Sequence, residues 1–145
     1  MPTVARLVAI LEDDADRVAA MRACLSAVLP GVDAVFFEDA REMITWLRHH
    51  LSEVELLSLD HDLPLRGRGG ATIDCGTGRQ VVDYLASLPP TCPVIVHSSN
   101  DACAAGMFFA LNDAGWTCSR VYPHDGEAWV RETWSERVRR HLTDR

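Results

Sequence analysis

The residues best suited to chemistry stand together in the stretch SLDHDLPL, residues 58–65. Asp60, His61 and Asp62 follow the apolar run VELLSL, whose length and composition are typical of a buried strand. Carboxylates bind hard cations through oxygen, and an imidazole can donate or accept a proton near neutral pH. The stretch therefore combines groups that can bind a metal ion with a group that can transfer protons.

Acidic residues also follow the first apolar run of the chain. Glu12, Asp13 and Asp14 come directly after RLVAIL, residues 6–11. Carboxylates from two neighbouring strand ends would repel one another unless a cation binds or some of them stay protonated. We therefore expect Asp13 and Asp60 to hold a hard cation such as Mg²⁺. The alternative is that the acids only cap the helix that follows them.

Two histidines are candidates for proton transfer. His61 lies between the two aspartates, and His97 begins the stretch HSSN after another apolar run. Neighbouring carboxylates raise the pKa of a histidine, and an imidazole near neutrality moves protons in either direction. A histidine at a strand end is more often a structural hydrogen-bonding residue, and that alternative stays open for both. His124, in VYPHDG, could reach the same site.

Two regions could bind an anion such as phosphate. Ser98 and Asn100 offer hydroxyl and amide groups, although Asn100 could equally cap the next helix. A glycine-rich loop earlier in the chain contains Arg66 and Arg68, whose guanidinium groups could clamp phosphate oxygens. The alternative is a flexible loop in which the arginines only add charge. We expect Cys75, in the same loop, to be exposed.

Short apolar runs alternate with helical patterns along the whole chain. The predicted strands are 6–11, 33–37, 54–59, 93–98 and 117–122, and the predicted helices are 15–29, 39–50, 78–88, 101–114 and 126–141. Strict alternation predicts a three-layer α/β/α fold, with a doubly wound parallel sheet between helices. At this length we expect the flavodoxin-like strand order 2-1-3-4-5. That order brings the polar residues after the first, third and fourth strands to one edge.

Length and composition limit the functional classes. The 145 residues predict a single domain over residues 1–145, and no apolar run approaches the roughly 20 residues that span a bilayer. The N-terminus has no cleavable signal, so we expect a cytoplasmic protein without membrane association. A net charge of −7 argues against duplex nucleic acid as a partner. The five cysteines form no C-x-x-C pair, which disfavours a zinc site or a disulfide framework.

The order of these residues resembles the receiver domain of two-component response regulators. In that resemblance Glu12 and Asp13 match the acid pair, Asp60 matches the phosphoacceptor and Ser98 matches the hydroxyl residue. Receivers also carry a lysine after the fifth strand, which grips the phosphoryl group. Every basic residue of this chain is an arginine, so that part of the pattern is missing.

A closer resemblance is to the receiver-like family called cyclic-phosphate processing receiver domains. The matching motifs are Leu11-Glu12-Asp13, Ser58-Leu59-Asp60-His61-Asp62-Leu63, Thr77-Gly78, and His97-Ser98-Ser99-Asn100 followed by Met107. The chain departs from the family at Pro64 and Asp101, where glycine and proline are common. The resemblance implies a metal-dependent phosphoesterase that acts on a small anionic substrate, a cyclic nucleotide or a 2′,3′-cyclic phosphate end, in bacterial nucleotide signalling.

The resemblance also implies a role for each site residue. Mg²⁺ or Mn²⁺ would bind to the carboxylates of Asp13, Asp60, Asp62 and Glu12. His97 would protonate the leaving oxygen, and His61 would act as the base or would orient its neighbours. The phosphate would be held by Ser98, Asn100, Arg66 and Arg68.

Two other functions remain open on the same fold. The chain could be an atypical receiver that is phosphorylated on Asp60 and switches a partner. It could also be a receiver-like module without catalysis that binds a protein partner or forms a homodimer. The Asp-x-Asp pattern at 60–62 also occurs in haloacid-dehalogenase-type phosphatases, but those enzymes use a lysine and place the motif after the first strand.

Overall fold

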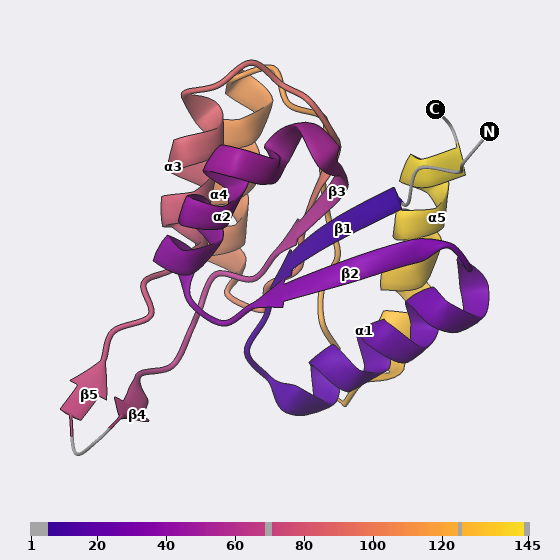
Figure 1. Cartoon of the computed structure of the whole chain (residues 1–145), viewed down its shortest axis with the longest axis horizontal. Helices are drawn as coiled ribbons and strands as arrows, with labels where there is room; N and C mark the ends of the chain where they lie inside the picture. Colours follow the sequence, from indigo (N-terminus) through magenta and orange to yellow (C-terminus); the bar gives the residue numbers. More distant parts are fainter. Residues whose placement is uncertain (1–5, 69–70, 125, 144–145) are drawn as a thin grey trace.

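Figure 1 shows a three-layer α/β/α fold with a parallel sheet in the middle. The computed structural model describes residues 6–68, 71–124 and 126–143, and for residues 66–68, 71 and 73 it describes the backbone alone. The sheet strands are β1 (Arg6–Leu11), β2 (Val32–Phe37), β3 (Val54–Leu59), β6 (Val94–Val96) and β7 (Cys118–Arg120). Their order is β2-β1-β3-β6-β7, all parallel, which confirms the predicted order 2-1-3-4-5.

The helices cover both faces of the sheet (Figure 1). One face carries α1 (Ala15–Val28) and α5 (Ser135–Thr143), and the other carries α2 (Ala40–His50), α3 (Gly78–Ala86) and α4 (Asp101–Asp113); η1 (Leu51–Glu53) follows α2. Each face has its own apolar core: Val8 and Ile10 of β1 belong to the core under α1 and α5, whereas Ala9 and Leu11 belong to the core under α2, α3 and α4. A strand buried on both faces needs a continuous apolar run, as RLVAIL provides. Within the described ranges, no helix combines the length and apolar character needed to cross a bilayer.

The last helix differs from the prediction of one continuous helix over 126–141. A π-helical turn, η2 (Val130–Trp134), precedes α5, and the amide of Ser135 donates to the carbonyl of Val130 five residues earlier. Trp129 precedes this wider turn and Trp134 is its last residue; both indoles are completely buried and belong to the same core. The turn therefore contributes two large side chains to the space beneath the polar edge of the sheet.

The loop between β3 and α3 contains structure that the sequence did not predict. Residues Arg66–Arg68 (β4) and Ala71–Ile73 (β5) form an antiparallel hairpin that projects away from the sheet (Figure 1). The expectation that Cys75 is exposed is wrong, because its side chain is 1% exposed and its carbonyl accepts the amide hydrogen of Ala40. The loop is therefore anchored on α2 before α3 begins.

Gly78 fixes the start of α3 directly under the strand end of β3. Its amide donates to the carbonyl of His61 at 2.9 Å. A Cβ atom at this position would lie 1.8 Å from the carbonyl oxygen of Asp60, so only glycine allows this approach. The helix thereby supports the backbone that presents Asp60 and His61.

Candidate active site

The register of the sheet places three polar residues at the same level. The amide of Asp60 donates to the carbonyl of Leu11 at 3.1 Å, and the amide of His97 donates to the carbonyl of Leu59 at 2.9 Å. Glu12 follows Leu11, so Glu12, Asp60 and His97 stand on three adjacent strands. One potential ligand atom from each lies within 4.8 Å of the others. The sheet thus brings together the ends of β1, β3 and β6, as expected for this topology.

A chain of buried hydrogen bonds runs from the C-terminal segment to Glu12. Trp134 Nε1 donates to Ser58 Oγ at 2.9 Å, Ser58 Oγ lies 2.6 Å from His97 Nδ1, and His97 Nε2 lies 3.2 Å from Glu12 Oε1. Because Ser58 accepts from Trp134, its own hydroxyl proton is available for His97 Nδ1. That arrangement leaves the ring proton on Nε2, where it is donated to Glu12. Both ring nitrogens of His97 are therefore engaged by protein groups.

Glu12 is completely buried, and its carboxylate accepts hydrogen bonds at both oxygens. Its Oε2 accepts from the backbone amides of Asp13 and Asp14, each at 3.1 Å, in addition to the contact of Oε1 with His97. Burial alone would raise the pKa of Glu12, but the hydrogen bonds from His97 and the Asp14 amide outweigh it and leave the pKa below its usual value. Glu12 therefore provides a fixed negative charge and orients the turn that carries Asp13.

Asp60 is a nearly buried carboxylate, 6% exposed. Burial raises its pKa to about 6, and the negative charge of Glu12 adds to the rise, although His97, the amide of His61 and the charge of Arg17 oppose it. The pKa of Asp13 is also raised, by burial first and by the charge of Glu12 next. Two carboxyl groups that resist ionisation at one edge are a donor set that a divalent cation would stabilise. The side chains of the edge therefore fit a hard metal ion.

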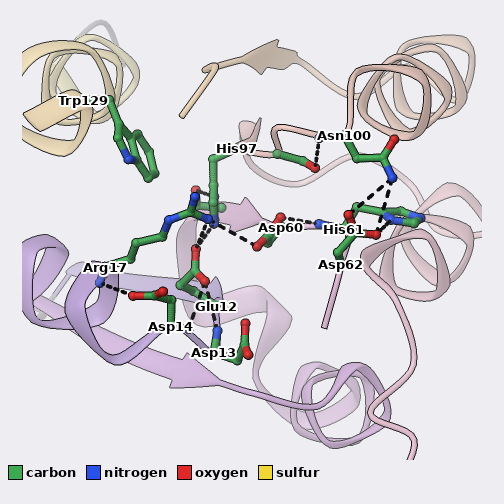
Figure 2. Close-up of polar contacts among 12 residues, drawn as sticks. Glu12, Asp13, Asp14, Arg17, Asp60, His61, Asp62, His97, Asn100 and Trp129 are labelled. Atoms are coloured by element: carbon green, nitrogen blue, oxygen red, sulfur yellow. Dashed lines mark hydrogen bonds and ion pairs between the residues drawn. The ribbon is translucent and has the colours of Figure 1, made fainter. Parts of the chain in front are cut away.

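Arg17 lies between the two buried carboxylates, and the sequence reasoning missed it. One guanidinium nitrogen, Nη1, is 3.5 Å from Glu12 Oε1 and 3.7 Å from Asp60 Oδ2. The guanidinium carbon is 5.5 Å from the centroid of the Trp129 ring, which itself stacks near His97 at 6.0 Å (Figure 2). The available signal was an arginine in the first turn of the helix that follows the acid pair.

His61 and Asp62 form a pair on the other side of Asp60 (Figure 2). His61 Nδ1 lies 2.7 Å from Asp62 Oδ1, and Asn100 Nδ2 lies 3.3 and 3.5 Å from the two oxygens of the same carboxylate. The hydrogen bond from His61 holds the pKa of Asp62 below its usual value. Among the described side chains, the second ring nitrogen of His61, Nε2, has no hydrogen-bond partner. This pair therefore has the geometry of an oriented imidazole with one nitrogen available.

The residues predicted to bind phosphate differ in their burial and in their hydrogen-bond partners. Ser98 is buried and accepts the amide hydrogen of Asn100 at 3.1 Å. Asn100 caps α4, since its Oδ1 accepts the amide hydrogen of Cys103, and its Nδ2 reaches Asp62; its role in binding phosphate stays a prediction. The side chains of Arg66 and Arg68 lie outside the described part of the chain.

Ser58, Trp129 and Trp134 were also missed by the sequence reasoning. Ser58 interrupts the apolar run VELLSL, and a hydroxyl inside a buried strand needs a partner, so a signal was present. Its partners come from residues 39 and 76 positions away in the chain. Trp129 and Trp134 lie in the segment predicted as the last helix, whose local pattern does not indicate these contacts.

Comparisons with known proteins agree on the family and on the fold. The family model described as "Cyclic-phosphate processing Receiver domain" matches residues 8–113. The phosphorylated cyanobacterial phytochrome response regulator RcpA is 19% identical, with 97% of this chain and 96% of that chain covered and a TM-score of 0.74. The response regulator domain of Thermotoga maritima CheB is 16% identical, with coverages of 95% and 96% and a TM-score of 0.67.

A third similar structure is the Mn²⁺-bound form of response regulator Rcp1. It is 15% identical, with 90% of this chain and 95% of that chain covered and a TM-score of 0.59. At these identities the three structures establish the fold alone. The comparison with curated proteins finds no match.

Proposed function

This chain belongs to the cyclic-phosphate processing receiver domain family, and on that premise we propose that it is a metal-dependent phosphoesterase that opens cyclic phosphates. The observation that supports this most is the position of Asp60. It is a buried carboxylate with a pKa of about 6, between Arg17 on one side and the His61–Asp62 pair on the other. Such a position combines metal binding, anion binding and proton transfer around one point.

Asp60 and Asp13 would hold the metal ion, Mg²⁺ or Mn²⁺, because both carboxyl groups have raised pKa values that a cation would lower. Asp62 would assist from the same strand end. When bound, the ion polarises phosphoryl oxygens and lowers the pKa of a coordinated water. Glu12, which the sequence also suggested as a ligand, already accepts hydrogen bonds at both oxygens. We propose that it orients Asp13 instead.

Arg17 would bind the phosphate. Its guanidinium group is now shared by two carboxylates at 3.5 and 3.7 Å, distances longer than those of a tight bidentate pair. A cation at the carboxylates would take over their charge compensation and leave Arg17 available for phosphate oxygens. Asn100, Arg66 and Arg68 remain further candidates for the same anion, whereas the Ser98 hydroxyl is buried and bonded to the Asn100 amide.

His61 would transfer the proton, oriented by Asp62. With the Nδ1 proton donated to Asp62, Nε2 is free to accept a proton from the attacking water or, once protonated, to deliver it to the leaving oxygen. The reaction adds one water molecule and breaks one phosphorus–oxygen ester bond, so that the cyclic diester becomes a monoester with a free hydroxyl. His97 is buried with both nitrogens occupied, so it would act by positioning Glu12 and not by protonating the leaving oxygen.

The compartment and the partners follow from the same features. None of the five cysteines, all of which lie in the described part of the chain, forms a disulfide, which suits a reducing compartment such as the cytoplasm. A net charge of −7 suits a small substrate held by a metal ion better than duplex nucleic acid. A receiver-type fold would also allow a protein partner or a homodimer.

A second candidate function is an atypical receiver with Asp60 as the phosphoacceptor. The fold shared with response regulators supports it, and Arg17 would be the cation beside the acceptor carboxylate. This function predicts a stable gain of one phosphoryl group after treatment with a small phosphodonor. The absence of lysine from the sequence counts against it.

Steady-state turnover tests the proposal. The purified protein would be assayed with Mn²⁺ or Mg²⁺ on 2′,3′-cyclic and 3′,5′-cyclic nucleotides, beside His61→Ala, His97→Ala and Asp60→Asn. We expect metal-dependent turnover that falls about 100-fold or more in His61→Ala. His97→Ala should reduce turnover and also lower stability. Undiminished turnover in Asp60→Asn, or no turnover with either metal on any of the substrates, would contradict the proposal.

A further inference from the structure

A cavity opens beside Arg17, and the proposed reaction uses none of the other residues that line it. Its volume is about 500 Å³, and its walls include Arg17, Ser99, Tyr122, His124, Asp14 and Glu127. Small-molecule sites have volumes of roughly 300–1,000 Å³. We propose that this Tyr122 cavity binds the nucleobase of the substrate, an inference that rests on the proposed phosphoesterase function.

Arg17 connects the cavity to the proposed reaction site. Arg17 lines the cavity, and its guanidinium group lies 3.5 and 3.7 Å from the carboxylates of Glu12 and Asp60. A phosphate held by Arg17 beside Asp60 would therefore have its organic part directed toward Ser99 and Tyr122. The cavity lies where the remainder of a phosphate ester has to go.

The aromatic wall of the cavity indicates a flat ligand. The side chain of Tyr122 is 53% exposed, and the ring of His124 meets it at 5.7 Å with an interplanar angle of 61°. Among the described residues, only Leu65, Phe109 and Tyr122 are large hydrophobic side chains with such exposure. Exposed aromatic rings stack on nucleobases with little dependence on base identity. Tyr122 is therefore suited to stack on a base.

The charges of the cavity restrict the number of phosphates on the ligand. Asp14 and Glu127 line the cavity, and each offers a carboxylate oxygen within 4.8 Å of the other. Carboxylates accept hydrogen bonds from base amino groups and ribose hydroxyls, but they repel additional phosphates. The substrate class is therefore a cyclic mononucleotide with a single phosphate. A cyclic phosphate at the end of an RNA chain, with further phosphates attached, fits less well.

Binding measurements test the inference separately from turnover. Isothermal titration in Mg²⁺, on the common background His61→Ala so that the ligands are not hydrolysed, would compare adenosine 2′,3′-cyclic phosphate with glycerol 1,2-cyclic phosphate, which has no base. On that background the proteins would be the otherwise wild-type chain, Tyr122→Ala, Tyr122→Phe and the control Phe109→Ala, which removes an exposed aromatic ring on α4 outside the cavity. We expect the nucleotide to bind about tenfold more tightly than the base-free ligand. That preference should disappear in Tyr122→Ala and persist in the other two variants.

The nucleobase site would be overturned by equal binding of the two ligands by the otherwise wild-type chain, or by an unchanged preference in Tyr122→Ala. Failure of both ligands to bind would also overturn the nucleobase site. The phosphoesterase proposal fails independently, since a protein that shows the Tyr122-dependent preference but no turnover keeps the nucleobase site. Glu127→Gln provides the test of charge, because it should improve the binding of a ligand with an added 5′-phosphate more than that of the mononucleotide.

Discussion

Replacing Asp60 by asparagine should stabilise the metal-free protein at neutral pH. The carboxyl group is nearly buried beside the ionised Glu12, and its pKa rises from 3.8 to about 6. The folded state therefore binds the Asp60 proton more tightly than the unfolded state does. An asparagine keeps an oxygen for the amide of His61, which donates to Asp60 Oδ1 at 2.7 Å, and removes the charge.

The magnitude follows from the pKa difference. A shift of about 2 pKa units corresponds to about 3 kcal/mol in the free energy of unfolding. Because the pKa is higher in the folded state, this cost is absent below about pH 4, grows as the pH rises through the interval to about 6, and is complete above it. Asp60→Asn should therefore equal the wild type near pH 4 and exceed its stability by up to about 3 kcal/mol near pH 8.

Urea unfolding followed by tryptophan fluorescence, in EDTA and reducing agent, measures this difference at several pH values. The matched control is Asp62→Asn. The hydrogen bond from His61 lowers the pKa of Asp62, so the control should lose stability at neutral pH and not gain it. If Asp60→Asn is no more stable than the wild type at pH 8 in EDTA, the description of Asp60 as a strained buried carboxylate is wrong.

Three further perturbations have expected results. Ser58→Ala leaves Trp134 Nε1 and His97 Nδ1 without their buried partner, so urea unfolding should show a loss of about 1–3 kcal/mol, together with reduced turnover. Gly78→Ala places a Cβ 1.8 Å from the Asp60 carbonyl oxygen, so the free energy of unfolding should fall by about 1–3 kcal/mol in the same measurement. In Gly31→Ala the new Cβ meets no atom within 4 Å, so that variant reports only the cost of a positive φ. Addition of Mg²⁺ at pH 8 should raise the wild-type melting temperature and leave that of Asp60→Asn nearly unchanged; an equal rise in both proteins would place the ion elsewhere.

The sheet could be predicted because its strands are buried on both faces. RLVAIL and VELLSL are uninterrupted apolar runs or nearly so, and their alternation with helical patterns permits few topologies. The same topology identified Glu12, Asp60 and His97 as neighbours, since parallel strands end at one edge. Local sequence patterns and the topology therefore predicted where the backbones of Glu12, Asp60 and His97 lie.

The partners of the side chains could not be predicted in the same way. The hydrogen bond between Ser58 and Trp134 joins residues 76 positions apart, and it depends on a π-helical turn that has no clear sequence pattern. The position of Arg17 depends on the orientation of α1 against the sheet and on the ring of Trp129. Burial of Cys75 depends on docking of the loop against α2. Each of these features is decided by tertiary packing and not by local spacing.

The most direct test of the central claim is phosphorus NMR of adenosine 2′,3′-cyclic phosphate incubated with the protein and Mn²⁺ or Mg²⁺. We predict that the cyclic phosphate resonance is replaced by that of a phosphomonoester, that EDTA stops the conversion, and that Asp60→Asn does not support it. An unchanged cyclic phosphate signal, combined with a stable phosphoryl group on Asp60 after treatment with a small phosphodonor, would contradict the account and identify an atypical receiver.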